Sequence, residues 1–306
     1  MIQIENSKND FQRKVINWYP GHMNKARKMM ESEMKLIDLV IEILDARAPL
    51  SSRNPDIDKM AQNKSRLVVM NKADLADKNI NEEWKEYFLS KGIKAIFVNS
   101  KNKEGLRSVL PAVKEVCKEK IERNLSKGIK NQLIRAMVVG IPNVGKSTFI
   151  NAYSGRNVAK AGNKPGVTVG KQWIKIDSSL ELLDTPGILW PKFEDKNVGL
   201  NLAFLGSIND EILVTEELAG ELLLFLKDNY PNLLKERYDL SEETCNTQNL
   251  DEYEQFATAQ SVMMDYIAKK RGCLKQGAST DYFKVGGIIL DDFRSGKIGK
   301  ITLERP

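Results

Sequence analysis

Two periodicities of apolar residues alternate over the first two thirds of the chain. Short continuous apolar runs, such as RLVVM at 66–70, are typical of strands that are buried on both faces. Between them lie segments with apolar residues at helical spacing, at 81–91, 106–125 and 146–153. This alternation predicts an α/β fold with a parallel sheet. The expected strands are residues 39–47, 66–70, 94–98, 134–139, 173–176 and 180–183.

The pattern changes after about residue 206, where almost every apolar residue falls at helical spacing. Helices are expected at 216–227, 252–271 and 280–295, and Gly272 is placed to end the second of them. The one short strand expected is at 300–303. The pattern therefore predicts a small all-helical second domain.

A phosphate-binding loop is predicted at Gly140–Ser147 (GIPNVGKS), which fits G-x-x-x-x-G-K-[ST]. The segment follows an apolar strand and opens a helix, as this loop requires. Its backbone N–H groups would point at phosphate oxygens, while Lys146 adds positive charge and Ser147 offers a hydroxyl to Mg²⁺. Lys146 is expected to face solvent in the empty site. The residues expected to contact the phosphates are Asn143, Val144, Gly145, Lys146, Ser147 and Thr148.

A second GTPase-like element, Asp184–Gly187 (DTPG), ends an apolar strand and matches D-x-x-G. Asp184 is expected to hold Mg²⁺ through water, and the Gly187 amide to contact the γ-phosphate. Thr168 lies between the two motifs and is expected to complete the Mg²⁺ ligands when GTP is bound. The alternative is a simple strand-ending turn, because D-x-P-G is favourable turn chemistry.

The guanine-reading pattern N-K-x-D is matched by Asn71–Asp74 (NKAD). The Asp74 carboxylate can accept hydrogen bonds from two donors of guanine that adenine does not offer together, which favours guanine strongly. Asn71 is expected to support the loop and the base, and Lys72 to lie along the ring face. Asn99–Lys101 matches a weaker S-A-K element with serine in place of alanine. The residues expected to bind guanine are Asn71, Lys72, Asp74, Asn99 and Ser100.

The guanine-reading motif precedes the phosphate loop, an inversion found in circularly permuted GTPases. Together with Trp18–Ala26, Asp45–Pro49 and Phe293–Thr302, this order resembles the bacterial ribosome biogenesis GTPase A family (the YlqF-type group) over residues 17–304. The resemblance implies a circularly permuted Ras-like P-loop GTPase domain followed by a small all-helical domain. It also implies hydrolysis of GTP to GDP in late maturation of the large ribosomal subunit. The expected parts are an N-terminal segment 1–30, the GTPase domain 31–205 and a helical ribosome-binding domain 206–306.

The catalytic group must differ from that of Ras-like enzymes. Ile188 follows D-x-x-G, where those enzymes have the glutamine that orients the attacking water, and isoleucine can neither donate nor accept. His22 is the only histidine, and imidazole can position or deprotonate water near neutral pH. The resembled family places its proposed catalytic histidine here. The alternative is that His22 contacts RNA or packs.

Asn143 suggests a monovalent cation. In several GTPases with G-x-x-N-x-G-K-S, this asparagine helps to bind K⁺, which supplies charge where other enzymes use an arginine finger. The alternative is that the loop merely tolerates a polar residue there.

The charge balance indicates a polyanionic partner. The net charge is +6, and nine Lys/Arg oppose four acidic residues between 269 and 306. With the resemblance, this predicts binding to the large-subunit precursor through rRNA and ribosomal proteins. The alternative is that these basic residues lie on ordinary solvent-exposed helix surfaces and bind no partner. A competing function is an RNA-binding scaffold whose guanine-nucleotide site tunes affinity with negligible turnover, which Ile188 favours.

Other classes of protein are disfavoured. No apolar run approaches the ~18 residues that a membrane span needs, and the first residues lack a signal-peptide pattern, so a cytoplasmic protein without membrane contact is expected. The three cysteines match no metal-binding spacing. The protein is expected to be a monomer in solution.

Overall fold

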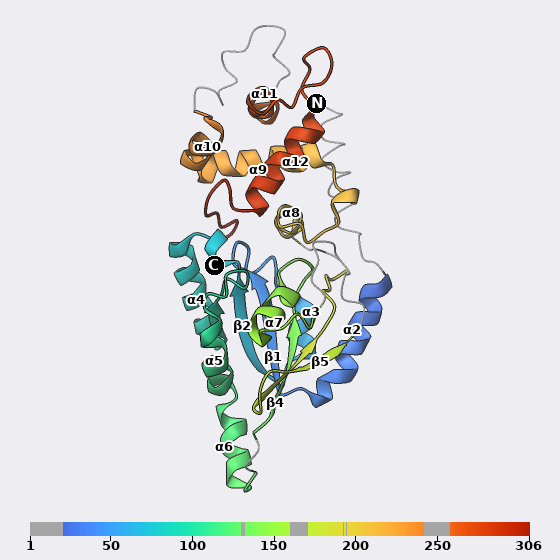
Figure 1. Ribbon diagram of the computed structural model, residues 1–306, viewed down its shortest axis with the longest axis vertical. Helices are drawn as coiled ribbons and strands as arrows, with labels where there is room; N and C mark the ends of the chain where they lie inside the picture. Colours follow the sequence, from blue (N-terminus) through green and yellow to red (C-terminus); the bar gives the residue numbers. More distant parts are fainter. Residues whose placement is uncertain (1–20, 130–131, 160–170, 192, 194, 242–257) are drawn as a thin grey trace. The chain divides into compact units, whose positions relative to one another are not determined.

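The computed structural model describes residues 21–129, 132–159, 171–191, 193, 195–241 and 258–306 (Figure 1). Its contacts divide the chain into two units. The nucleotide unit holds the described residues up to Leu202 together with Thr302–Pro306, and the helical unit holds those of Ala203–Ile301. The chain therefore leaves the nucleotide unit after Leu202 and returns to it at Thr302. The helical unit thus ends before the expected boundary at residue 306, because hydrogen bonds tie the final residues to the nucleotide unit.

A six-stranded sheet, in the order β3-β2-β1-β4-β6-β5, forms the centre of the described nucleotide unit. Five strands are parallel and only β5 is antiparallel, to β6. The all-parallel expectation was wrong at this edge, because a short turn at Asp177 joins β5 to β6 as a hairpin. The strands are β1 (Leu39–Asp45), β2 (Ser65–Asn71), β3 (Lys94–Phe97), β4 (Ile134–Val139), β5 (Gln172–Lys175) and β6 (Leu180–Asp184).

The strand order places the candidate site. β1 and β4 are neighbours in the sheet. From β1 the chain continues to β2 on one side, and from β4 it continues to β5 and β6 on the other, so the loops that follow β1 and β4 diverge. Ligands of open α/β sheets bind at such a point, at the carboxyl ends of the strands. The register pairs Asp45 with Asn71 and Val138 with Asp184, so all four sequence motifs emerge along one edge.

Helices flank this sheet, with α4 and α5 running beside its β2–β3 side (Figure 1). The single helix expected at 106–125 is broken at Cys117. α5 buries residues against β2 and β3 whereas α6 buries none, so the break falls where support from the sheet ends. The helices and short 3₁₀ turns are α2 (Gly21–Glu33), η1 (Met34–Leu36), α3 (Pro55–Met60), η2 (Ala73–Leu75), α4 (Lys78–Ser90), η3 (Leu106–Ser108), α5 (Val109–Val116), α6 (Lys118–Ser126), α7 (Lys146–Ser154) and α8 (Lys196–Phe204).

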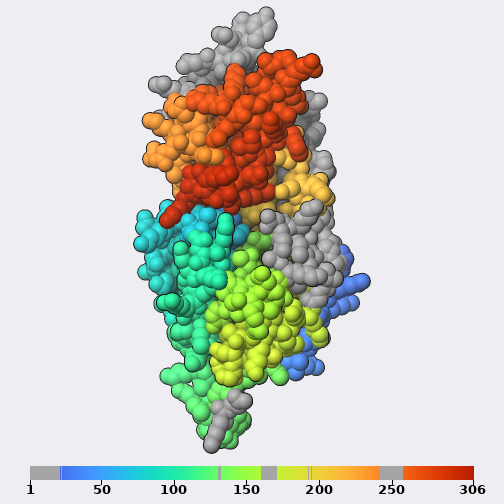
Figure 2. All heavy atoms as spheres, viewed as in Figure 1, coloured from blue at the N-terminus to red at the C-terminus, as the bar shows by residue number. Residues whose placement is uncertain are grey.

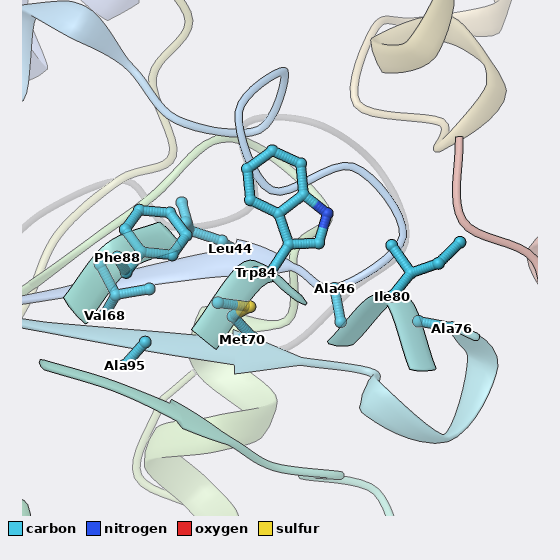
Figure 3. Packing of buried hydrophobic residues seen from close by; sticks show 9 residues of the cluster. All are labelled: Leu44, Ala46, Val68, Met70, Ala76, Ile80, Trp84, Phe88 and Ala95. Atoms are coloured by element: carbon cyan, nitrogen blue, oxygen red, sulfur yellow. The ribbon is translucent and has the colours of Figure 1, made fainter. Parts of the chain in front are cut away.

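The apolar core beside β2 is built around α4. Trp84 and Phe88 are completely buried, as their helical spacing predicts, and Trp84 packs edge-on against Tyr87 with ring centroids 5.3 Å apart. This core fixes α4 next to the guanine-reading loop, which lies between β2 and α4. Figure 3 shows the buried cluster: Leu44, Ala46, Val68, Met70, Ala76, Ile80, Trp84, Phe88 and Ala95.

The helical unit is centred on α9, which contacts α10, α11 and α12. Three of its helices match expectation within the described residues, while α10, which begins at Pro231, was missed. Gly272 ends α11 with φ +66°, as predicted. No strand forms at 300–303, because the Leu303 N–H donates to the Arg47 carbonyl rather than to a neighbouring strand. The elements are η4 (Asp210–Ile212), α9 (Thr215–Asn229), α10 (Pro231–Tyr238), α11 (Ala259–Arg271) and α12 (Tyr282–Arg294).

Arg294 has a structural role inside the helical unit. Its guanidinium donates to the carbonyls of Ala203 and Phe204, at 2.9 and 3.0 Å, and pairs with Asp210 at 2.7 Å. These acceptors include the last carbonyls of α8, which have no partner within their own helix. Arg294 thus caps α8 and is not available as a phosphate contact.

Candidate guanine-nucleotide site

The phosphate loop connects β4 to α7 through backbone angles that few residues tolerate. φ is +62° at Asn143 and +95° at Gly145. A Cβ at Gly145 would lie only 2.3 Å from Nδ2 of Asn71, so both the backbone angle and the close approach require glycine. Val144 is buried, Ser147 is half-buried and Thr148 is exposed. The phosphate loop therefore touches the guanine-reading motif directly.

Lys146 and the D-x-x-G loop meet at the start of α7. Lys146 is only 7% exposed and its Nζ donates to the Ile141 carbonyl at 3.1 Å. The expectation that it faces solvent was wrong, because Gly187 covers it: a Cβ at Gly187 would lie 2.7 Å from Nζ. The Thr185 hydroxyl donates to the Val138 carbonyl at 2.7 Å, which holds the start of the D-x-x-G loop against β4.

Asp184 carries the observation that bears on Mg²⁺. It is 2% exposed, and its Oδ1 has no hydrogen-bond partner among the described residues. Burial raises the pKa of Asp184, although attraction to Lys146 opposes the shift. A buried carboxylate oxygen without a donor is rare and fits a Mg²⁺ ligand, direct or through water. The described residues contain no cluster of three or more His, Cys, Asp or Glu able to hold a metal.

Asn71 joins three motifs with one side chain. Its Nδ2 donates to the Val144 carbonyl at 2.8 Å, and its Oδ1 accepts from the Ser100 N–H at 3.1 Å. Asn71 ends β2, Val144 lies in the phosphate loop, and Ser100 follows β3. The amide thus fixes the guanine-reading loop, the phosphate loop and the S-A-K element relative to one another.

Lys72 lies in a charged network that sequence reasoning did not assign to the site. Its Nζ lies 2.8 Å from Oδ2 of Asp45 and donates to the Asn143 carbonyl at 2.8 Å. Asp45 is fully buried and also pairs with Arg47 at 2.9 Å. Burial would raise the pKa of Asp45, but Arg47 and Lys72 together hold it well below its usual value. Asp45 therefore positions the lysine from β1. The signal available in the sequence was an acidic residue ending an apolar strand.

The remaining guanine candidates lie around this network. Asp74 is exposed within η2, where its carboxylate is accessible to a base. Oδ1 of Asn99 accepts from the N–H groups of Lys101 and Asn102, each at 3.1 Å, so Asn99 shapes its own loop. Ser100 is buried, and its hydroxyl has no hydrogen-bond partner among the described residues.

Ile188 is buried, and its backbone is held by Asn54, which lies in the loop that follows β1. It is 1% exposed, and its carbonyl accepts from Nδ2 of Asn54 at 3.2 Å. Asn54 also caps α3 by accepting from the Asp56 N–H at 2.9 Å. The residue that replaces the usual glutamine is thus a packed core residue, and Asn54 is a site neighbour that the sequence reading missed.

Two predicted residues cannot be placed against this geometry. Thr168 lies outside the described residues. His22 lies in the first turn of α2, and its side chain is likewise outside the description. Within the described residues, no helix is long and apolar enough to cross a membrane.

Comparison with known proteins explains this arrangement. A ribosome biogenesis GTPase A from Bacillus licheniformis is 48% identical over 95% of this chain and 99% of its own length. The chain belongs to the ribosome biogenesis GTPase A family. It is a GTPase. A bovine mitochondrial ribosome-associated GTPase 1 is 31% identical over 96% of the chain and 90% of its own length.

The permuted fold is likewise found in a solved structure. The crystal structure of GNP-bound YlqF from T. maritima superposes with a TM-score of 0.60, at 25% identity, over 92% of this chain and 98% of that one. A family model described as "50S ribosome-binding GTPase" matches residues 135–263. The GTPase thus has the expected circularly permuted P-loop domain followed by helices.

Proposed function

We propose that this GTPase is an assembly factor that acts in late maturation of the large ribosomal subunit and binds its rRNA. The names of its relatives support a ribosomal role, and the family description names the 50S particle. The observation that carries the enzymatic part is the Asn71 bridge, which joins the guanine-reading loop to the phosphate loop and so forms one nucleotide site. The proposed partner is the large-subunit precursor, which this GTPase would bind as a monomer in the cytoplasm.

The geometry of the described residues supports the nucleotide roles expected from the sequence. Asp74 reads guanine, with Asn71, Lys72, Asn99 and Ser100 shaping the base pocket. The phosphate loop binds the phosphates through its backbone N–H groups, and Lys146 adds charge. Mg²⁺, bound by Ser147 and Thr168 and by Asp184 directly or through water, would neutralise charge on the β- and γ-phosphates. The Gly187 amide meets the γ-phosphate. The complete phosphate set is Asn143, Val144, Gly145, Lys146, Ser147, Thr148 and Gly187.

His22 is proposed as the catalytic group that replaces the missing glutamine. Its helix is anchored close to Ile188: Arg27 of α2 pairs with Asp56 at 3.2 Å, and Asn54, at the start of the same helix as Asp56, donates to the Ile188 carbonyl. These contacts link α2, through α3, to the residue that follows the D-x-x-G loop, and so support a role for His22 near that loop.

The function is tested by measuring GTP turnover with and without purified large subunits. Slow intrinsic hydrolysis that large subunits accelerate, and small subunits do not, is the expected result. Hydrolysis that neither particle changes would contradict an assembly role. Turnover that remains negligible with both would instead favour the scaffold function.

K⁺ is expected to stimulate hydrolysis through Asn143 roughly tenfold or more over Na⁺, a modest part of the ~10³–10⁵ that an arginine finger supplies. Asn143→Gly is the sharpest variant, because glycine keeps the positive φ of +62° while removing the side chain. Rates are measured in K⁺ and Na⁺ at matched ionic strength. Equal rates in the two salts for the unmodified GTPase would remove the cation role.

The RNA surface is proposed on the helical unit, where the residues from α11 to Ile301, orange to red, make up much of that unit's visible face in Figure 2. Lys269, Lys275 and Lys284 are exposed there. Arg294 is excluded by its structural role in capping α8. Phosphate contacts from exposed lysines would make binding salt-dependent, with a slope near −0.7 to −0.9 per contact.

Reversal of these three charges (Lys269→Glu, Lys275→Glu, Lys284→Glu) is expected to weaken large-subunit binding about tenfold or more and to flatten the salt slope by roughly 2–3. Sedimentation binding at several salt concentrations measures both. Lys118→Glu on α6 is the matched control, since that lysine is 73% exposed on the nucleotide unit. An unchanged slope in the triple variant would move the RNA surface elsewhere.

A further inference from the structure

The segment that follows the D-x-x-G loop is held at both ends by one short stretch of chain. At its start, the Ile188 carbonyl accepts from Asn54 at 3.2 Å. At its end, Nδ2 of Asn201, in α8, donates to the Ser51 hydroxyl at 3.0 Å and to Oε2 of Glu304 at 3.3 Å. Ser51 and Asn54 both belong to the loop that follows β1.

This loop is a firm support. Ser51, Ser52 and Asn54 are at most 2% exposed. The Ser52 hydroxyl donates to the Ala48 carbonyl at 2.6 Å and accepts from the Asp45 N–H at 3.0 Å. Asp45 is the residue that positions Lys72. The same loop thus supports the guanine-reading motif on one side and the D-x-x-G segment on the other.

Glu304 completes the second anchor from the far end of the chain. Its Oε1 accepts from the N–H groups of Leu50 and Ser51, and its Oε2 accepts from the Ser51 hydroxyl as well as from Asn201. One carboxylate therefore receives four hydrogen bonds from the loop and from α8. Oε1 accepts from backbone N–H groups of the loop, whereas Oε2 accepts from the side chains of Ser51 and Asn201, so a change at Oε2 alters the link to α8 and leaves the backbone contacts in place.

The backbone around Glu304 is fixed as well. The Trp84 indole donates to the Glu304 carbonyl at 3.2 Å, and the Leu303 N–H donates to the Arg47 carbonyl at 2.7 Å. Oγ1 of Thr302 accepts from the Asp77 N–H at 3.0 Å, at the start of α4. The carboxylate is thus presented to Asn201 from a rigid frame of core and loop.

We propose that Glu304 is a positioning residue for the binding of GTP. It holds α8 so that the D-x-x-G loop stays closed on Lys146. The inference rests on the proposed contact of Gly187 with the γ-phosphate. With Ile188 and Asn201 both anchored, the position of Gly187 against Lys146 is favoured before nucleotide arrives. Weakening of the distal anchor, which also includes the bond from Asn201 to the Ser51 hydroxyl, lowers the population of that closed arrangement, which GTP needs and GDP does not.

Glu304→Gln tests this with the smallest change. An amide nitrogen in place of Oε2 puts a donor against the Asn201 and Ser51 hydroxyl donors, while the remaining oxygen still accepts from the N–H groups of Leu50 and Ser51. Because Oε2 accepts from both Asn201 and the Ser51 hydroxyl, the substitution disturbs two hydrogen bonds, and we expect a non-hydrolysable GTP analogue to bind about three- to tenfold more weakly, with GDP affinity changed less than twofold. Displacement of a fluorescent guanine nucleotide measures both affinities, and thermal denaturation checks the fold.

Two further variants distinguish a positioning role of Glu304 from a general effect on the stability of the fold. Glu304→Gln combined with Asn201→Asp restores the hydrogen bond with its direction reversed, and should recover the affinity for the GTP analogue. Arg305→Ala is the matched control: it removes a neighbouring ion pair with Glu83, whose side chains are 68% and 44% exposed, and should bind both nucleotides normally.

The outcomes distinguish this inference from the proposed function. Equal weakening of GTP analogue and GDP, unchanged binding of both, or failure of the double variant to recover would overturn the positioning role. Absence of guanine-nucleotide binding by the unmodified GTPase would instead refute the nucleotide site itself.

Discussion

Asp74→Asn is expected to move the base preference of this GTPase from guanine toward xanthine. The exposed Asp74 carboxylate is expected to accept two hydrogen bonds from guanine, and an amide cannot accept both. Xanthine carries a carbonyl where guanine has its amine, so the amide nitrogen can donate to it. A site built on such pairing discriminates by ~10⁴–10⁵, so we expect GTP affinity to fall by about 10² or more while XTP affinity rises.

Competitive titration of GTP and XTP measures the exchange. Glu86→Gln, on the exposed surface of α4, is the control for loss of one negative charge and should leave both affinities unchanged. Unaltered GTP affinity in Asp74→Asn would show that another residue reads the base.

His22→Ala is expected to lower the subunit-stimulated kcat by roughly 10²–10⁴-fold, the usual contribution of a positioned acid–base group, with GTP affinity nearly unchanged. The site otherwise lacks a water-orienting group at the usual position, because Ile188 is buried and its carbonyl is engaged by Asn54. Single-turnover hydrolysis in the presence of large subunits isolates the chemical step.

His22→Gln separates the two ways in which imidazole can act. Glutamine can orient water but cannot take its proton, so recovery of most activity with a weak pH dependence would indicate positioning alone. If His22→Ala binds subunits normally and hydrolyses GTP at the full stimulated rate, the histidine has no catalytic role and the subunit supplies the missing group.

Local motifs made much of the fold predictable from the sequence. Four patterns, each placed after an apolar run, located the ends of β2, β3, β4 and β6, because parallel strands bring their carboxyl ends to one edge. The reversed order of Asn71–Asp74 and the phosphate loop identified the permutation. These features depend on residues close together in the chain, which a sequence displays directly.

What the sequence did not show depends on contacts between distant residues. The burial of Lys146 follows from Gly187 packing over it, and the role of Asp45 follows from its pairing with Lys72. The break at Cys117 reflects where the sheet stops supporting a helix. The antiparallel β5 results from a short hairpin connection. Periodicity describes one segment at a time and carries no information on such partners.

The return of the chain at Thr302 has a consequence for how the protein is made. The Trp84 indole receives its acceptor from a residue 220 positions later, and Glu304 accepts from Leu50 and Ser51 over a similar span. A nascent chain that lacks its last residues leaves these donors without acceptors, each at a cost of about 1–3 kcal/mol where it is buried. Contacts of such long sequence separation form late and slowly. The nucleotide unit is therefore completed only after Thr302–Pro306 have been synthesised, so a chain that stops before Thr302 carries an incomplete nucleotide unit, although most of that unit precedes Ala203.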